Sequence, residues 1–236
     1  MERRLFLLVV CAGLLAGCVG RDASRAEALL QRAAATQEHL ASAGMQARFT
    51  IKSDRDHAAM FMDGAGYLSG PWAGDGYFRM RLTGHVQGGV RTIAVVRRGD
   101  RVTMRVNGRR QRLAVASAGS ELGSGLVDFT EFAGLARYVK DVSVDEVTFH
   151  GRPVDRIVGT LDTRAMLRTF GFGAQALAGA KADIGDMHAN IFIPRDTHVI
   201  EAIFLDLDFT LNSHPEHMRF ALVFDRLNQR VVFPSI

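Results

Sequence analysis

The side chains that could do acid–base or metal chemistry gather near the end of the chain, at Asp206, Asp208, His214 and His217. The two histidines are three residues apart, but the pattern places them in a turn between strands with no third ligand nearby. The two aspartates alternate with apolar residues, which is typical of the wet side of an antiparallel sheet. We therefore predict that this region holds neither a metal ion nor a catalytic acid–base pair.

No other motif in the sequence points to catalysis or to a cofactor. No serine has the Gly-X-Ser-X-Gly spacing of a nucleophile elbow. The glycines that might cradle a phosphate fall in or beside predicted β-turns and open no helix; they are Gly64, Gly66, Gly70, Gly74 and Gly76. We predict that the protein is not an enzyme and uses no cofactor.

Cys18 lies directly after the first apolar run of the chain. Arg3 and Arg4 precede the apolar residues 5–15, a stretch shorter than the roughly twenty residues that cross a bilayer as a helix. The sequence Leu15-Ala16-Gly17-Cys18 resembles a bacterial lipobox, which implies cleavage after residue 17 and lipidation of Cys18. Two or three acyl chains would then hold the protein stably at a membrane. The alternative is an ordinary signal peptide with a cysteine near its cleavage site by chance.

The expected organisation is a signal peptide over residues 1–17, a lipidated tether over 18–23 and one domain over 24–236. The composition is ordinary for a globular domain, with 47% hydrophobic and 23% charged residues. The formal net charge of +4 is small, and the arginines are not interleaved with aromatic residues. We therefore predict no nucleic-acid binding.

Hydrophobic periodicity predicts an amphipathic helix followed by a mainly β domain of the α+β class. Residues 24–41 carry apolar side chains at helical spacing, and from Met45 the period changes to two. Asn107-Gly108 between two such runs is a strong hairpin signal. We expect about eleven antiparallel strands and a helix over 128–138. Over 171–186, a short helix at 174–181 and a mobile flap fit equally well.

The strands place many flexible or aromatic apolar side chains on one face, where they predict either an ordinary core or an apolar cavity. Methionine in particular adapts to irregular partners. A cavity of about 300 to 1,000 Å³ would suit a small ligand or a larger one. The candidate cavity residues are Phe49, Ile51, Phe78, Met80, Leu82, Met104, Ile191, Phe209 and Phe220.

The order of these features resembles a known group of bacterial proteins. A lipobox, an amphipathic helix, an antiparallel meander, a helix near Asp128 and further strands ending in a proline are similar to the LolA/LolB and LppX/LprG lipoproteins and carriers. Residues 193–197 (Ile-Pro-Arg-Asp-Thr) are similar to the turn of that group before a long strand, although Arg195 departs from its pattern. Residues 220–234 resemble its closing strand pair.

The resemblance implies a half-open antiparallel β-barrel wrapped over helices, with an apolar cavity for acyl chains. It further implies a lipoprotein anchored at the cell membrane or outer membrane, facing the periplasm or the cell exterior, that carries or hands over a lipid or lipidated molecule. The resemblance also implies a monomer and allows an envelope partner protein. Two alternatives are an anchored sensor or interaction module of the RseB type and a structural lipoprotein with a filled core. Cys18 is the single functional residue that the resemblance transfers.

Overall fold

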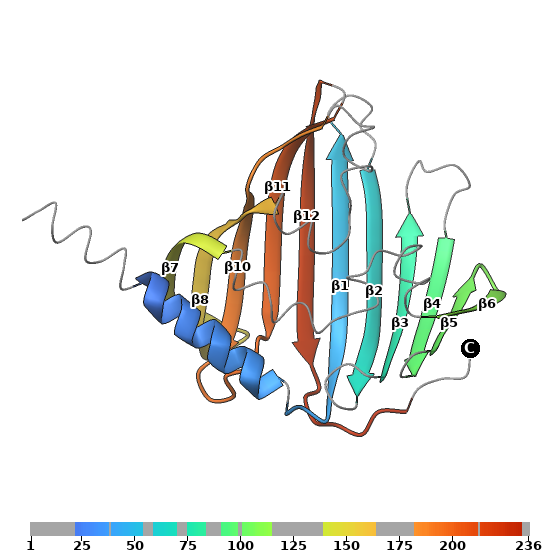
Figure 1. The fold of residues 1–236 in the computed structure, drawn as a ribbon, viewed down its shortest axis with the longest axis horizontal. Coiled ribbons are helices and arrows are strands. Elements are labelled where there is room, and N and C mark those ends of the chain that lie inside the picture. The colour runs from blue at the N-terminus through green and yellow to red at the C-terminus, as the bar shows by residue number, and fades with distance from the viewer. Residues whose placement is uncertain are drawn as a thin grey trace, which may run out of the picture.

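The computed structural model describes residues 22–37, 39–53, 59–69, 75–83, 91–98, 101–114, 139–163, 182–211 and 213–232. Cys18, the signal segment, the helix expected over 128–138 and the stretch 174–181, for which a helix and a flap were both left open, lie outside these residues. The described residues form a helix over 22–37 and twelve strands (Figure 1). Because Asp22 and Ala23 are already helical, the helix begins inside the stretch expected to be a tether.

The twelve strands belong to one antiparallel sheet. Eleven of them follow one another in the order β6-β5-β4-β3-β2-β1-β12-β11-β10-β8-β7, and the short β9 pairs with β11. The sheet does not close on itself, as Figure 1 shows. This confirms the prediction of a mainly β, half-open architecture. The strands are β1 (Ser42–Ser53), β2 (Ala59–Ser69), β3 (Asp75–Thr83), β4 (Arg91–Arg98), β5 (Arg101–Val106), β6 (Arg109–Ala114), β7 (Val139–Phe149), β8 (Arg152–Leu161), β9 (Ala182–Ile184), β10 (Met187–Pro194), β11 (Ala202–Leu211) and β12 (His214–Asp225).

The first and last long strands, β1 and β12, pair at the centre of the sheet (Figure 1). Their register places Phe49 opposite Phe220. On one side of this pair, β2 to β6 continue as a meander of hairpins. The hairpin predicted at Asn107-Gly108 is confirmed: both residues have positive φ, 47° and 85°, which suits the twist of a two-residue hairpin loop.

Several strand ends differ from the sequence prediction. β1 begins at Ser42 rather than at Met45. His214 and His217 lie within β12 and not in a turn, because Leu211 pairs directly with His214 and Ser213 takes a left-handed φ of 67°. β9 falls in the stretch over 171–186 for which the sequence left the structure open.

Strand alternation gives the sheet two faces. We call the face that carries Ala43, Met45 and Ala47 of β1 the apolar face, and the opposite one the charged face. The main core lies on the apolar face and includes Ile191 and Leu222. A second, smaller cluster on the same face consists of Val95, Val102 and Met104. Burial is thus concentrated on the side of the sheet from β12 to β8.

The helix packs on the apolar face through small residues. Ala26, Leu30 and Ala33 are buried in the main core, and the helix crosses the β8 and β10 end of the sheet in Figure 1. Alanine at this interface lets the helix backbone approach the sheet closely. Among the described residues, no helix has the length and apolar character that crossing a membrane requires.

An ion-pair network fixes the start of the helix to the sheet. Arg25 lies 2.9 Å from Asp155 on β8 and 3.3 Å from Glu146 on β7. Arg195, just after β10, lies 3.1 Å from Asp155 and 2.5 Å from Glu146. Hydrogen bonds from Arg195 and then Arg25 hold the pKa of the Glu146 carboxyl below its usual value, and the same contacts raise the pKa of Arg195. We call these four residues the helix clamp.

Candidate functional site

The register places all nine candidate cavity residues on the apolar face. Phe49 and Ile51 lie on β1, opposite Phe220 and Met218 of β12. Met80 and Leu82 are assigned to the same face from the register of their strand with β2. The sequence thus predicted correctly which side chains share one face, and that face is the first candidate for a binding site. That they line a cavity remains a prediction.

Burial changes along the two central strands of this face. On β1, Ala43, Met45 and Ala47 are buried, whereas Phe49 and Ile51 are partly exposed. Along β12 and β11, the side chains of this face likewise change from buried to partly exposed. We call the partly exposed group the half-buried stretch; it consists of Phe49, Ile51, Phe209, Met218 and Phe220. Met218 is the member that sequence analysis omitted from its cavity candidates, although its alternation with Phe220 placed it on the inward phase.

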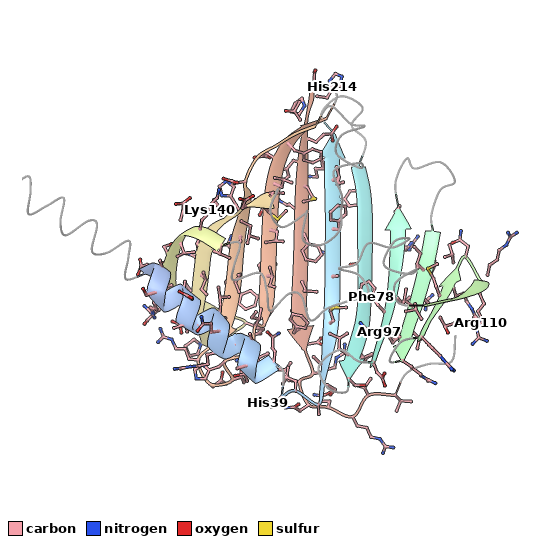
Figure 2. All side chains as sticks on the ribbon, viewed as in Figure 1. His39, Phe78, Arg97, Arg110, Lys140 and His214 are labelled. Atoms are coloured by element: carbon pink, nitrogen blue, oxygen red, sulfur yellow. The ribbon has the colours of Figure 1, made fainter. Side chains whose placement is uncertain are left out.

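Three of the nine candidates are fully packed instead. Ile191 and Phe78 belong to the main core, and Met104 belongs to the small cluster. Phe78, labelled on β3 in Figure 2, lies opposite Gly66 of β2. A Cβ on Gly64 would come within 2.5 Å of the Phe78 ring, so the missing side chain makes room for the aromatic ring. Ile191, Phe78 and Met104 are thus buried as core residues.

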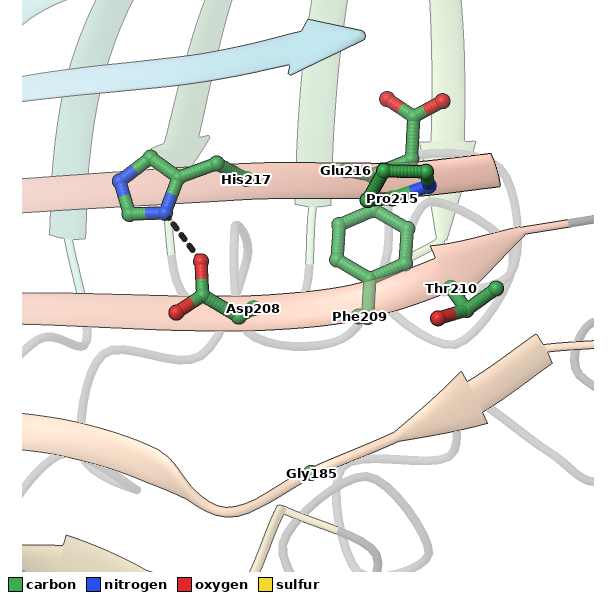
Figure 3. A pocket seen from close by; sticks show the side chains of 7 residues that line it. All are labelled: Gly185, Asp208, Phe209, Thr210, Pro215, Glu216 and His217. Carbon is green, nitrogen blue, oxygen red and sulfur yellow. Dashed lines mark hydrogen bonds and ion pairs between the residues drawn. The ribbon is translucent and has the colours of Figure 1, made fainter. Parts of the chain in front are cut away.

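A hollow of about 370 Å³ lies at the end of the β11–β12 hairpin (Figure 3). His217 Nδ1 there donates a hydrogen bond of 2.6 Å to Asp208 Oδ1, and its Nε2 lies 3.5 Å from Asp206 Oδ1 without a hydrogen bond. Both ring nitrogens therefore face carboxylates. The remaining lining residues are Gly185, Phe209, Thr210, Pro215 and Glu216.

These contacts are those of a cross-strand charge ladder. Asp206 also accepts a hydrogen bond of 2.7 Å from Arg219 Nε, and all these groups lie on the charged face by register. The described residues contain no group of three or more His, Cys, Asp or Glu side chains arranged to hold a metal ion. The arrangement supports the solvated face that the sequence indicated at Asp206 and Asp208.

The helix clamp is a feature that sequence analysis missed. Its residues come from segments more than a hundred positions apart, so no local motif joins them. One signal was present in the sequence. Asp155 lies at the same alternating positions of its strand as Ile157 and Leu161, whose side chains point inward. A carboxylate at such a position needs a positively charged partner.

Comparison with known proteins identifies the fold. No family model and no curated protein sequence matches this chain. Among solved structures, LprF from Mycobacterium bovis is similar with a TM-score of 0.57 and 11% sequence identity, over 90% of this chain and 97% of LprF. The lipoprotein LppX from Mycobacterium tuberculosis is similar with a TM-score of 0.54 and 14% identity, over 89% of this chain and 98% of LppX. The chain thus has the fold of LprF and LppX, as the sequence resemblance to the LolA/LppX group predicted.

Proposed function

We propose that this protein is a membrane-anchored cell-envelope lipoprotein that binds a lipid or lipidated molecule on the apolar face of its sheet and carries it or hands it over. The observation that carries the proposal is the half-buried stretch. Phe220 and Met218 pack against the main core, and together with Phe49 they extend the apolar face with side chains that stay partly exposed. Partly exposed aromatic and methionine side chains form the kind of surface that accepts an acyl chain, because they adapt to irregular apolar partners.

The fold supports this proposal. LppX is itself named a lipoprotein, and its similarity extends over nearly the whole of both chains. The position of His217 supports a non-catalytic role, because it belongs to a cross-strand charge ladder with Asp206 and Asp208. We therefore propose a binding protein rather than an enzyme.

The proposed anchor is the lipidated sulfur of Cys18 after removal of residues 1–17. Replacing Cys18 with Ala in cells is expected to move the protein from the membrane fraction to the soluble fraction. A Cys18→Ala protein that stays in membranes after washing with high salt and carbonate would contradict the anchor and leave the lipid-binding proposal to its own test.

Lipid binding is tested by native mass spectrometry of the chain without residues 1–17. The parent protein is expected to carry bound lipid. Met218→Trp should reduce lipid occupancy at little cost in stability, because the added volume enters the space that the ligand occupies. Met45→Trp is the matched control: Met45 is fully buried on the same face, so the larger side chain should overpack the core and destabilise the protein by about 1 to 3 kcal/mol.

Two results would contradict lipid carriage. The first is a parent protein that carries no lipid even when it is purified under conditions that retain lipid. The second is an equal fall in melting temperature for Met218→Trp and Met45→Trp, with occupancy unchanged. Either result would favour the sensor or the structural lipoprotein that the sequence left as alternatives.

A further inference from the structure

One region of the chain is far more basic than the rest. Residues 75–114 contain ten arginines and two aspartates, a formal charge of +8, whereas the whole chain carries +4. The rest of the chain therefore carries −4. These residues supply β3, β4, β5 and β6, so the positive charge lies at one end of the sheet.

Register brings seven of these arginines onto the charged face, and the structure describes the side chains of six of them. Arg79 lies opposite Ala94, and Ala94 opposite Arg105. All six side chains are exposed to solvent, and Arg110 is labelled at the outer edge of the sheet in Figure 2. We call this group the arginine surface; it consists of Arg79, Arg81, Arg98, Arg101, Arg105 and Arg110.

Like charges oppose each other directly within this surface. Arg105 is the register partner of Arg110, and Arg98 is the register partner of Arg101. Side chains at such positions are about 5 Å apart at Cβ, and like charges placed there destabilise a sheet. An anion between the guanidinium groups would relieve this repulsion, since arginine binds phosphate oxygens through two parallel N–H donors.

Among the described residues, two carboxylates lie near these arginines by register. They are Asp63, opposite Arg81, and Asp75, opposite Arg98. Asp63 lies 3.5 Å from Arg48, a further arginine on β1. Arg48, Arg79 and Arg81 together border a hollow of about 410 Å³ on the charged face. The hollow is wide enough for a phosphate-bearing headgroup and is lined mainly by basic and small side chains.

The other end of the charged face is arranged differently. Arg156 pairs with Asp145, and Arg219 pairs with Asp206, at 2.5 and 2.7 Å. Three phenylalanines pack together there, with ring centroids 4.4 to 6.2 Å apart; they are Phe149, Phe192 and Phe204. Cationic charge is therefore paired with carboxylates at this end, whereas arginines oppose one another at the other end.

We propose that the arginine surface binds the anionic headgroups of a lipid membrane. The surface is one face of a sheet, on which Thr103 lies between Arg101 and Arg105 of β5, and Ala94 of β4 lies between Arg79 and Arg105. The ring of Tyr67, on the same face, is already covered by the guanidinium of Arg226 at 4.5 Å. Its guanidinium groups are spread over four strands of one face, which fits a layer of phosphates. Tyr77 and the exposed Phe61 also lie on this face, and aromatic rings can stack on nucleic-acid bases, so the test includes an oligonucleotide.

The test measures cosedimentation with vesicles of phosphatidylcholine alone or mixed with phosphatidylglycerol. The protein used is the chain from Val19 onward, which contains every contact described above. The parent should bind the anionic vesicles and not the neutral ones, and binding should weaken as salt is raised. Arg105→Gln with Arg110→Gln should weaken binding about fivefold for each arginine removed. The same double variant should melt at an equal or higher temperature, because it removes the Arg105–Arg110 repulsion.

The matched control is Arg156→Gln with Arg219→Gln. It removes the same net charge from the same face of the sheet, but from arginines that already have carboxylate partners. Vesicle binding should be nearly unchanged, and the melting temperature should fall slightly or stay the same. Together the two double variants separate the position of the charge from its total amount.

Three outcomes would overturn the proposal. Equal losses of binding in both double variants would mean that net charge alone is responsible. Thermal stabilisation of the parent by inorganic phosphate, abolished by Arg105→Gln with Arg110→Gln and accompanied by no vesicle binding, would identify a small-anion site. An oligonucleotide that displaces the parent from vesicles and binds it more tightly would identify a nucleic-acid surface.

Discussion

The two ends of the sheet differ in the contacts that stabilise them. The end formed by β7, β8, β10, β11 and β12 carries the helix, most of the main core and paired charges. The end formed by β3 to β6 carries a small buried cluster and directly opposed arginines. The first end is stabilised by contacts within the chain. The second lacks comparable contacts among its described residues, which is what we expect of a surface that meets a partner.

The largest expected difference between the ends concerns their cores. Met187 lies in the main core and Met104 in the small cluster, and both are 3% exposed. Replacing a buried methionine with alanine costs about 2 to 5 kcal/mol, and we expect Met187→Ala to fall in this range for global unfolding by denaturant. Met104→Ala should cost less globally and should instead speed hydrogen exchange within β4 to β6, because this end can open separately. Equal global losses with no local opening would show one uniformly cooperative sheet.

A smaller effect is expected from the ion pairs. Asp155 is 7% exposed and accepts hydrogen bonds from Arg25 and Arg195, so Asp155→Asn should lower the free energy of unfolding by about 1 to 3 kcal/mol. Asp63→Asn removes one partner of an exposed pair with Arg48 and should change stability by less than about 1 kcal/mol. Denaturant titration of both variants measures the contrast. A cost at Asp63 as large as that at Asp155 would mean that the clamp is no stronger than a surface pair.

The smallest effect is the pH dependence of the helix clamp. Arg195 and Arg25 lower the pKa of Glu146 from its ordinary value of 4.5, so ionised Glu146 stabilises the folded state above that value. This contribution should disappear as the pH falls through the lowered pKa, because the protonated carboxyl no longer pairs with the arginines. The melting temperature of the parent should exceed that of Glu146→Gln near neutral pH, and the two should converge in acid. A difference that stays constant down to acid pH would contradict the role of this charge.

Local patterns in the sequence predicted the elements well. The alternation along β11 and the Asn107-Gly108 turn are encoded by neighbouring residues, and both were found as expected. The pairing of Phe49 with Phe220 was not predictable in this way, because strand order depends on contacts between segments distant in the sequence.

The candidate site was likewise predictable only where neighbouring residues determine it. That Phe49, Phe209 and Phe220 share a face followed from the alternation of apolar residues. The alternation did not show which of the nine candidates are packed in the core. The burial of Phe78, for example, depends on Gly64 and Gly66 of the neighbouring strand. From the sequence, the arginines of β3 to β6 led to the prediction of no nucleic-acid binding. Their direct opposition in Arg105–Arg110 required the strand register.

An open sheet has two outermost strands, and here, among the described strands, they are β6 and β7. The backbone groups along such a strand can pair with another molecule, which is how sheets grow into fibrils. β6 is six residues long and carries Arg109, Arg110 and Arg112, so two copies meeting there would bring arginines together across about 5 Å. β7 has an irregular ladder between Lys140 and Ser143, which offers a poor template for regular pairing. Charge at one edge and irregularity at the other therefore oppose polymerisation of a protein whose sheet is not closed.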